Sequence, residues 1–321
     1  MTPEEKAELI TRNSAEVIGN ERILSLIGGK KPVVYCGYET SGEVHLGHLV
    51  TITKLLDLQK AGCEVIVLFA DWHTWLNRKG DWDFIHEQTK HWEKAFKAAG
   101  LEKARYVLGS TFQRTPGYMD DVMALALATT MNRALRSMQE VARDIEHAHV
   151  SQVLYPLMQI ADMKHLKVDM ATAGLEQRKI HMLGQESLSA INYPAPVFIH
   201  TPLIPSLKGP ETKMSSSVPE SLISVRDSAE DIKKKMNKAY CPEGITENNP
   251  IILMAELLIF PRMKTFVIDR PEKFGGKVRF DNIAELKTAY ESKRLFPLDL
   301  KNAVAEEMIK ILEPIRKAFQ K

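Results

Sequence analysis

The chain has 321 residues, of which 44% are hydrophobic and 26% are charged, as is ordinary for a soluble globular protein of about two domains. Its formal net charge of +2 excludes a protein that binds nucleic acid through overall charge, so any such contact must come from local patches. No stretch approaches the roughly 18 consecutive apolar residues of a membrane span. The first residues, acidic and helix-like, do not resemble a signal peptide.

The cysteines are few and widely separated. Cys36, Cys63 and Cys241 lie too far apart in the sequence for a CxxC-type metal site. We therefore expect reduced thiols in a cytoplasmic protein without a structural metal.

The first two thirds of the chain alternate short apolar runs with amphipathic stretches. This order of strand, helix and strand predicts an α/β fold, a Rossmann-like doubly wound parallel sheet with right-handed crossovers. Ligands of such sheets bind at the carboxyl ends of the strands. Strands are expected at 32–37, 63–71, 104–110 and 195–204, and helices at 46–60 and 81–100.

From about residue 228 the pattern becomes mainly helical, interrupted by short extended pieces such as 264–268. We expect a domain boundary near 219–228. The predicted division is a Rossmann-like domain over 1–222, with an insertion at about 112–150, and a mainly helical C-terminal domain over 223–321.

The first turn from strand to helix reads "YCGYETSGEVHLGHLV" and lacks the GxGxxG pattern of dinucleotide-binding proteins. His45 and His48 are three residues apart, so they share one helix face, and Gly47 lies between them. The start of a helix favours anions through its unpaired N–H groups and dipole. Two imidazoles over a glycine would suit a nucleotide phosphate. The alternatives are ordinary surface histidines or a metal pair, for which no further ligands appear at suitable spacing.

A second polar run, KMSSS, occupies residues 213–217. One lysine and three hydroxyls, with glycine and proline nearby, suit a loop that closes over a polyphosphate. HLGH followed by KMSSS within one α/β domain resembles the two signatures of the class I aminoacyl-tRNA synthetases. The resemblance implies that an amino-acid carboxylate attacks the α-phosphate of ATP. Catalysis then reduces to positioning and to stabilising negative charge.

The resemblance also implies a nucleotide site. His45 and His48 would donate to the ATP phosphates, Lys213 would place its ammonium on the β- and γ-phosphates, and Mg²⁺ would be carried mostly by phosphates and water. The implied catalytic residues are His45, Gly47, His48, Lys213, Ser215 and Ser216. The implied ATP-binding residues are Gly37, His45, Gly47, His48, Lys213, Met214, Ser215, Ser216 and Ser217.

Further segments indicate which amino acid is the substrate. In "LYPLMQIADMKHL", Tyr155, Gln159 and Asp162 fall at i, i+4 and i+7, on one face of a helix. "EQRKIHM", KMSSS and "RPEKFGG" follow in order, and "DLKNAVAEEMIKILEPIRK" lies near the end of the chain. Over nearly the whole length, these segments closely resemble the tyrosyl-tRNA synthetases of the short archaeal/eukaryotic type.

That resemblance implies a tyrosine site in which Tyr35 and Asp162 hydrogen-bond the phenol hydroxyl. Phenylalanine would leave both groups unpaired, at a cost of about 1–3 kcal/mol per group. Without this context, Tyr155 and Asp162 would suit a helix face with one solvated acid. The residues implied to hold the α-amino group are Tyr155, Gln159, Gln177 and Glu39.

The RNA contacts rest on the same resemblance. Arg136 and Arg178 match positions that face the first base pair of the acceptor stem, although "RALRSMQEVAR" would also suit a solvated basic helix. Asp299 would accept hydrogen bonds from the first anticodon base, a guanine, and Phe274 and Cys241 would flank it. The implied tRNA-binding residues are Arg136, Arg178, Cys241, Phe274, Phe296 and Asp299.

Two features of the C-terminal segment have less definite roles. Phe296 stands where relatives often have histidine. The lysines of the helical stretch either touch phosphates or form a solvated face; they are Lys233, Lys234, Lys235 and Lys238.

The resemblance thus implies a ligase that activates tyrosine with ATP and charges tRNA(Tyr), and a homodimer that forms through helices around 112–150. A tryptophanyl enzyme would share the fold and both signatures, but Tyr35 and Asp162 suit a phenol hydroxyl better than an indole N–H. A non-catalytic tRNA-binding protein would have no need of a phosphate clamp. A nucleotidyltransferase of related fold would leave the anticodon-like segments unexplained.

Overall fold

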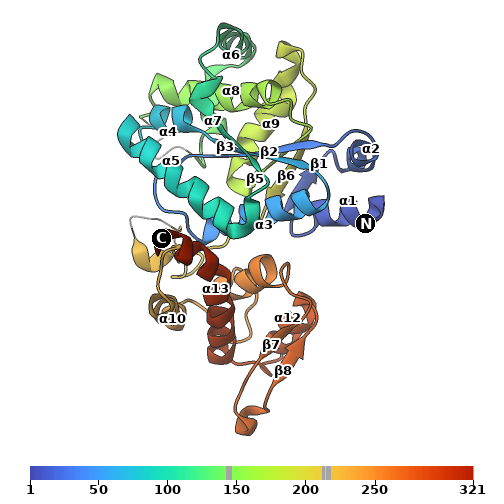
Figure 1. Cartoon of the computed structure of the whole chain (residues 1–321), viewed down its shortest axis with the longest axis vertical. Helices are drawn as coiled ribbons and strands as arrows, with labels where there is room; N and C mark the ends of the chain where they lie inside the picture. Colours follow the sequence, from blue (N-terminus) through green and yellow to red (C-terminus); the bar gives the residue numbers. More distant parts are fainter. Residues whose placement is uncertain (142–146, 212–213, 215–217, 321) are drawn as a thin grey trace. The chain divides into compact units, whose positions relative to one another are not determined.

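The computed structural model describes residues 1–141, 147–211, 214 and 218–320. These residues form two compact units, drawn in Figure 1. The first unit comprises Met1–Ser41, Lys54–Glu93 and Leu101–Pro202, and the second comprises Gly42–Thr53, Lys94–Gly100 and Leu203–Lys321. The division into domains at residue 222 stays a prediction.

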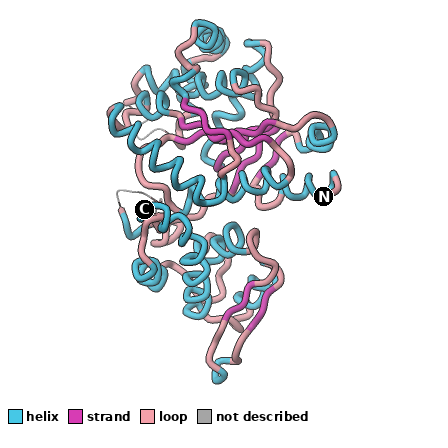
Figure 2. Tube along the Cα trace, in the orientation of Figure 1, coloured by secondary structure: helices cyan, strands magenta, loops and turns pink. Residues whose placement is uncertain are grey.

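A six-stranded sheet with strand order β1-β6-β5-β2-β3-β4 forms the centre of the first unit, as Figure 2 shows. The neighbouring strands are parallel, except that β1 pairs with β6 in the antiparallel direction. The strands are β1 (Glu16–Ile18), β2 (Val33–Tyr38), β3 (Glu64–Phe69), β4 (Arg105–Leu108), β5 (Met170–Gly174) and β6 (Val197–Thr201).

The predicted Rossmann-like sheet is confirmed, and the structure adds two strands that the sequence analysis did not propose. β5 reads MATAG, whose small side chains give little strand propensity, yet all five residues are buried between neighbours. β1 has only three residues and lies at the sheet edge. Both strands are fixed by their pairing partners more than by their own sequence.

Helices cover the sheet of the first unit on both faces. α8 (Val150–His165) and α9 (Arg178–Ser187) lie on one side, and α5 (Trp82–Phe96) lies on the other (Figure 1). After α5 the chain turns at Gly100, whose φ of 108° is accessible mainly to glycine. The remaining helices of this part of the chain are α1 (Pro3–Thr11), α2 (Ile23–Gly28), α3 (Leu46–Lys60), α4 (Asp71–Leu76), α6 (Pro116–Ala128) and α7 (Met131–Ser137).

The second unit is mainly helical, as predicted. It contains an antiparallel hairpin of β7 (Phe266–Ile268) and β8 (Val278–Phe280). The helices of its C-terminal segment are α10 (Ala229–Lys238), α11 (Pro250–Met254), α12 (Ile283–Glu291) and α13 (Pro297–Gln320), and the start of α3 also belongs to this unit. In the described ranges, no helix has the length and apolar character needed to cross a membrane.

Candidate active site

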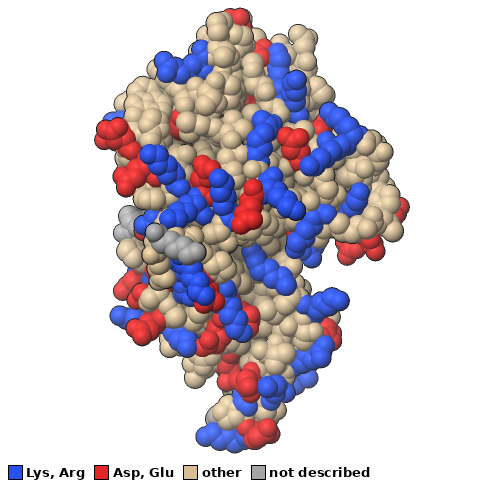
Figure 3. Space-filling view, viewed as in Figure 1, with Lys and Arg blue, Asp and Glu red and all other residues tan. Residues whose placement is uncertain are grey.

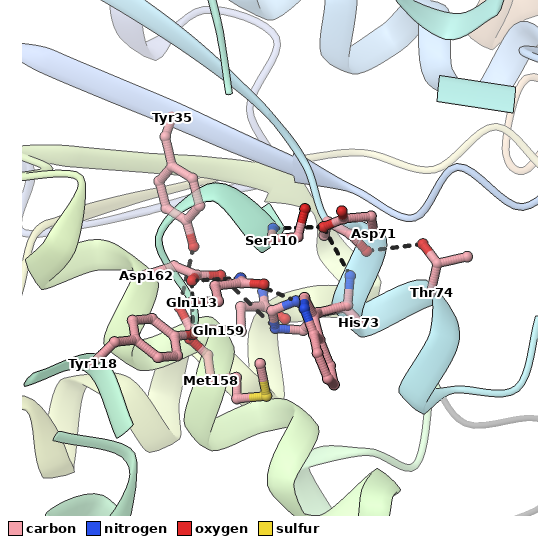
Figure 4. Close-up of polar contacts among 12 residues, drawn as sticks. Tyr35, Asp71, His73, Thr74, Ser110, Gln113, Tyr118, Met158, Gln159 and Asp162 are labelled. Atoms are coloured by element: carbon pink, nitrogen blue, oxygen red, sulfur yellow. Dashed lines mark hydrogen bonds and ion pairs between the residues drawn. The ribbon is translucent and has the colours of Figure 1, made fainter. Parts of the chain in front are cut away.

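Tyr35 on β2 and Asp162 on α8 point toward the same buried group of polar side chains in the first unit (Figure 4). The two residues are 2% and 1% exposed. The Tyr35 hydroxyl lies 3.5 Å from the backbone carbonyl oxygen of Gln159, a long hydrogen bond. Burial, and then the charge of Asp162, raise the pKa of Tyr35 well above its ordinary value. The hydroxyl is therefore a protonated donor at neutral pH.

One oxygen of Asp162 is held by two side chains, and the other is not. Gln113 Nε2 donates to Asp162 Oδ1 at 2.8 Å, and the Tyr118 hydroxyl lies 2.8 Å from the same oxygen. Among the described residues, Oδ2 has no hydrogen-bond partner. Burial raises the pKa of Asp162 to about 7, against the opposing effect of the two hydrogen bonds. The cluster presents a buried, unpaired acceptor.

Asp71 and His73, at the start of α4, complete this group, which we call the Asp162 cluster: Tyr35, Asp71, His73, Gln113, Tyr118 and Asp162. Asp71 Oδ1 accepts from the backbone N–H of Ser110 at 2.8 Å and so joins the carboxyl ends of β3 and β4. His73 Nε2 lies 3.8 Å from Asp162 Oδ2. Burial lowers the pKa of His73 to about 3, against a smaller effect of the Tyr155 carbonyl. His73 is therefore neutral, and its contact with Asp162 is not an ion pair.

The residues implied to hold an α-amino group come together only in part. α8 places Tyr155, Gln159 and Asp162 on one helix, as the spacing predicted. Gln159 Nε2 donates to Gln177 Oε1 at 3.4 Å. Glu39 is already engaged, since it accepts from Asn77 at 2.9 Å.

Lys79 is the second partner of Glu39, with which it forms an ion pair. The ammonium of Lys79 therefore neutralises the negative charge of Glu39 without a bound substrate. A substrate ammonium that bound Glu39 would share this carboxylate with Lys79.

The HLGH segment forms the start of α3 in the second unit. His48 Nδ1 accepts from the backbone N–H of His45, and His45 Nδ1 accepts from the backbone N–H of Gly47, both at 3.1 Å. Because each Nδ1 is an acceptor, each ring carries its proton on Nε2 when it is uncharged. Burial lowers the pKa of His45 to about 4. At neutral pH His45 is thus an uncharged Nε2–H donor beside a helix N-terminus.

The chain that follows KMSSS pairs with the chain that precedes HLGH, within the same unit. Leu46 N–H donates to the Ile223 carbonyl at 2.9 Å, and Val225 N–H donates to the Val44 carbonyl at 3.1 Å. A Cβ on Gly47 would lie 4.0 Å from Met214 Sδ. The structure therefore places Met214 beside the HLGH segment.

Of the KMSSS motif, the structure describes Met214. Lys213, Ser215, Ser216 and Ser217 lie outside the described residues. Gly37, the other residue implied for ATP, is in β2 next to Tyr38. No three His, Cys, Asp or Glu side chains in the described ranges are grouped so that they could hold a metal ion.

Several polar residues of the site were missed in the sequence analysis. His73, Gln113 and Tyr118 belong to no motif and approach Asp162 only through the fold. Glu176 follows β5, its Oε2 has no partner within the part of the chain described, and burial raises its pKa. Its place beside Gln177 in "GLEQRKIHM" was the signal that could have identified it.

The two arginines implied for the acceptor stem lie at the surface of the first unit. Arg136 is exposed near the end of α7. Arg178 is also exposed and forms two hydrogen bonds with Glu16, of 2.7 and 2.9 Å, which lower the pKa of Glu16. An RNA phosphate that bound Arg178 would compete with this carboxylate.

The residues implied for the anticodon all belong to the second unit. Phe296 is 48% exposed and directly precedes α13, and Asp299 lies in the first turn of that helix. Cys241 Sγ lies 3.1 Å from the Tyr290 hydroxyl. Phe274 ends a short 3-10 turn, Glu272–Phe274.

Two of the four lysines on α10 form ion pairs. Lys233 pairs with Glu306 at 2.7 Å, and Lys235 pairs with Asp227 at 2.6 Å. These two charges are compensated within the protein. The ion pairs therefore support a solvated lysine face on α10 more than a face that contacts RNA phosphates.

Comparison with known proteins identifies the family. The model of the family "tRNA synthetases class I (W and Y)" matches residues 29–313. The chain belongs to this family of class I synthetases. A tyrosine–tRNA ligase from Methanoculleus marisnigri is 51% identical over 308 residues, 96% of each chain. One from Archaeoglobus fulgidus is 49% identical over 316 residues, 98% of this chain and 97% of the relative.

Solved structures give the same result. The A. fulgidus tyrosyl-tRNA synthetase complexed with L-tyrosine superposes with a TM-score of 0.95 at 48% identity and covers 99% of both chains. The tryptophanyl-tRNA synthetase from Giardia lamblia, at 18% identity, has a TM-score of 0.75 and covers 100% of this chain and 86% of its own, which shows a shared fold alone. Within its class, the chain is therefore a tyrosine–tRNA ligase, and the predicted fold and enzyme class are confirmed.

Proposed function

We propose that the chain joins the carboxylate of tyrosine to the α-phosphate of ATP, releasing pyrophosphate, and then transfers the tyrosyl group to the 3′ end of tRNA(Tyr). The observation that carries this proposal is the buried Asp162 Oδ2, an acceptor without a partner among the described residues, beside the Tyr35 hydroxyl donor. The phenol hydroxyl of a bound tyrosine can donate to Asp162 Oδ2 and accept from the Tyr35 hydroxyl.

This arrangement accounts for selection against phenylalanine. A bound phenylalanine would leave Asp162 and Tyr35 desolvated and unpaired, which costs about 1–3 kcal/mol for each neutral group and more for a charged one. Tyrosine-specific synthetases are the standard example of such discrimination by a buried polar site. The α-amino group is assigned to Tyr155, Gln159 and Gln177.

The phosphate chemistry is assigned to the two signature segments. The tyrosine carboxylate supplies the nucleophile, the new bond forms between its oxygen and the α-phosphorus, and the bond to the β-phosphate oxygen breaks. The Nε2–H groups of His45 and His48 donate to phosphate oxygens at the N-terminus of α3. Lys213 and Ser215–Ser217 clamp the pyrophosphate that leaves. Mg²⁺ enters with ATP and neutralises phosphate charge, with ligands drawn mainly from phosphates and water.

The tRNA is bound by individual side chains at two places on the surface, and not by an overall positive charge of the protein. Basic and acidic side chains are interspersed over the face shown in Figure 3, in agreement with the net charge of +2. We assign the acceptor stem to Arg136 and Arg178, and the anticodon to Phe296, Asp299 and their neighbours in the second unit. The cytoplasm is the proposed location.

A homodimer belongs to the same proposal, and the surface of α6 supports it. Met119, Met123 and Leu127 are 40%, 45% and 92% exposed and recur every four residues, so they form one apolar stripe along this helix. A stripe of this kind is typical of a surface that a second subunit covers. The stripe lies within the region 112–150 predicted for the interface.

Exchange of pyrophosphate into ATP without tRNA tests the activation step. Tyrosine, tryptophan and phenylalanine are supplied one at a time. Exchange with tyrosine is expected to exceed by far the exchange with tryptophan or phenylalanine. Exchange with tryptophan would keep the phosphate clamp and overturn the assignment of Asp162 and Tyr35, and absence of exchange with all three would overturn the catalytic proposal.

A further inference from the structure

Within the Asp162 cluster, one donor and one acceptor face each other without forming a bond. His73 Nε2 and Asp162 Oδ2 are 3.8 Å apart, too far for a hydrogen bond. Both residues are 1% exposed, and neither atom has a hydrogen-bond partner among the residues described. Two unpaired polar atoms at such depth are costly unless a ligand completes them.

The amide of Gln113 decides which nitrogen of His73 carries the proton. Gln113 Nε2 lies 2.8 Å from Asp162 Oδ1 and 3.4 Å from His73 Nδ1. The amide nitrogen has two hydrogens, so it can donate to both atoms, and Nδ1 is then an acceptor. The opposite orientation of the amide would place its carbonyl oxygen against the carboxylate of Asp162, where two acceptors would face each other without a hydrogen between them. Because burial keeps the His73 ring neutral, its proton lies on Nε2.

A hydroxyl is the chemical group that satisfies this pair of atoms. One oxygen can accept from the Nε2–H of His73 and donate its own hydrogen to Asp162 Oδ2, at about 2.7–3.0 Å from each. An ammonium has no lone pair to accept from the Nε2–H of His73, and an ether oxygen or a fluorine has no hydrogen to donate to the carboxylate. The ring of His73 is held edge-on against Tyr155, with centroids 4.7 Å apart and planes at 88°, so its direction is fixed by packing.

We propose that His73 is a third residue that recognises the phenol hydroxyl of tyrosine, through Nε2–H, with Gln113 as the positioning residue that fixes this tautomer. The proposal rests on the proposed function and deepens it. The phenol oxygen accepts from His73 and donates to Asp162, and Tyr35 contributes a further donor. Phenylalanine would then leave a neutral buried donor unpaired in addition to Asp162 and Tyr35.

The first test replaces His73 by phenylalanine, which keeps an aromatic ring of similar size and removes both nitrogens. Pyrophosphate exchange is measured with tyrosine and with phenylalanine. We expect kcat/KM for tyrosine to fall about 10- to 100-fold while kcat/KM for phenylalanine stays constant or rises. His73→Gln, whose amide nitrogen can reach the position of Nε2, should restore part of the preference. An equal loss with both amino acids would overturn the proposal.

A matched control comes from the buried histidine of α9. His181 is 1% exposed, and its Nδ1 lies 2.9 Å from His200 Nε2, away from the Asp162 cluster. His181→Phe removes a comparable buried imidazole, so any loss of stability should lower the two exchange activities together. A change of the tyrosine-to-phenylalanine ratio in this control equal to that of His73→Phe would also overturn the proposal.

The second test observes the ring itself, by ¹⁵N NMR of labelled protein. With tyrosine bound, His73 should be the neutral Nε2–H tautomer, and its Nε2 resonance should shift relative to the phenylalanine complex. Gln113→Leu should populate the Nδ1–H tautomer. The same resonance with both amino acids would indicate a permanently bound water instead and would overturn the assignment.

The two proposals fail in different ways. If wild-type protein shows no exchange with tyrosine, the proposed function is wrong. If wild-type exchange is specific for tyrosine but His73→Phe keeps the same ratio, only the role of His73 is wrong.

Discussion

Asp162 combines a functional requirement with a cost in stability. Its carboxylate is 1% exposed, and burial raises its pKa from an ordinary 3.8 to about 7. Gln113 and Tyr118 compensate one oxygen and leave the other for the substrate. The unpaired oxygen therefore lowers the stability of the free protein, as is common where binding sites need unsatisfied groups.

This cost should appear as a pH dependence. Between pH 4 and pH 7 the folded protein holds a proton on Asp162 that the unfolded chain has lost, so the Asp162 contribution to the free energy of unfolding falls as pH rises. The asparagine of Asp162→Asn does not ionise, so its contribution to the free energy of unfolding does not fall as pH rises. We expect the variant to exceed the wild type by up to about 4 kcal/mol at pH 8 and to differ little at pH 4, as measured by urea unfolding.

The same variant should fail to support exchange with tyrosine, because an amide cannot replace the carboxylate as a pure acceptor. A variant that was less stable than the wild type at pH 8 would contradict the raised pKa. Equal differences at both pH values would assign the effect to packing.

At the scale of elements, the start of α3 shows how a short motif creates a site. The two histidine rings of HLGH accept backbone N–H groups at the helix N-terminus, and they lie 3.9 Å apart between ring centroids. Their Nδ1 atoms thus accept N–H groups of the helix start, and the proton of the uncharged His45 ring lies on Nε2. The role of Gly47 is steric, because a Cβ there would lie 3.0 Å from His45 Cε1.

Gly47→Ala separates helix stability from nucleotide binding. Alanine favours a helix interior by about 1 kcal/mol over glycine, so the free energy of unfolding should stay within about 1 kcal/mol of the wild type. The Cβ displaces the His45 ring, and we expect kcat/KM for ATP in pyrophosphate exchange to fall about tenfold or more.

Tyrosine binding without ATP, measured by calorimetry, should be unchanged in Gly47→Ala. Loss of tyrosine affinity would show that the substitution disturbs more than the phosphate site. Gly28→Ala at the end of α2 is the matched control, because a Cβ there meets nothing within 4 Å, and its activity should equal that of the wild type.

At the scale of the whole molecule, two proposed partners remain to be tested: tRNA at the second unit and a second copy of the chain at α6. Asp299 lies in the first turn of α13, where an acidic side chain is favoured by the helix dipole. Its removal should therefore cost the protein only about 0.3–1 kcal/mol. A larger effect on tRNA would have to come from lost recognition.

Asp299→Ala should raise the KM for tRNA about tenfold or more in aminoacylation while adenylate formation stays at the wild-type rate. Glu307→Ala, on the same helix, removes a carboxylate that pairs with Lys310 at 2.8 Å and serves as the control. Equal loss of both steps in Asp299→Ala would mean that Asp299 is structural.

The apolar stripe on α6 predicts a substitution that dissociates the homodimer into monomers. Leu127 is 92% exposed, and an arginine in its place would bury an uncompensated charge at a dimer interface. Leu127→Arg should therefore shift the protein from dimer to monomer in sedimentation or light scattering. Leu24→Arg, at another residue that is 52% exposed, should leave the dimer intact. A monomeric wild type would refute the proposed interface.

The local parts of this structure were predictable from sequence. The helix expected at 46–60 is α3, Leu46–Lys60, and the face shared by Tyr155, Gln159 and Asp162 follows from helical spacing alone. These features depend on neighbours within a few residues, whose contacts are fixed by helix geometry. The two signature motifs and the tyrosine–tRNA ligase family were identifiable for the same reason, since each motif is contiguous.

Tertiary structure alone decided the rest. β5 forms from a sequence of low strand propensity because β2 and β6 pair with it. Gln113 contacts Asp162, which lies 49 positions further along the sequence, and no local pattern encodes that contact. The sequence by itself determined which elements form and which chemistry they carry. Packing determined which buried atoms are paired and which stay open for the substrate, because that depends on side chains brought together from distant parts of the chain.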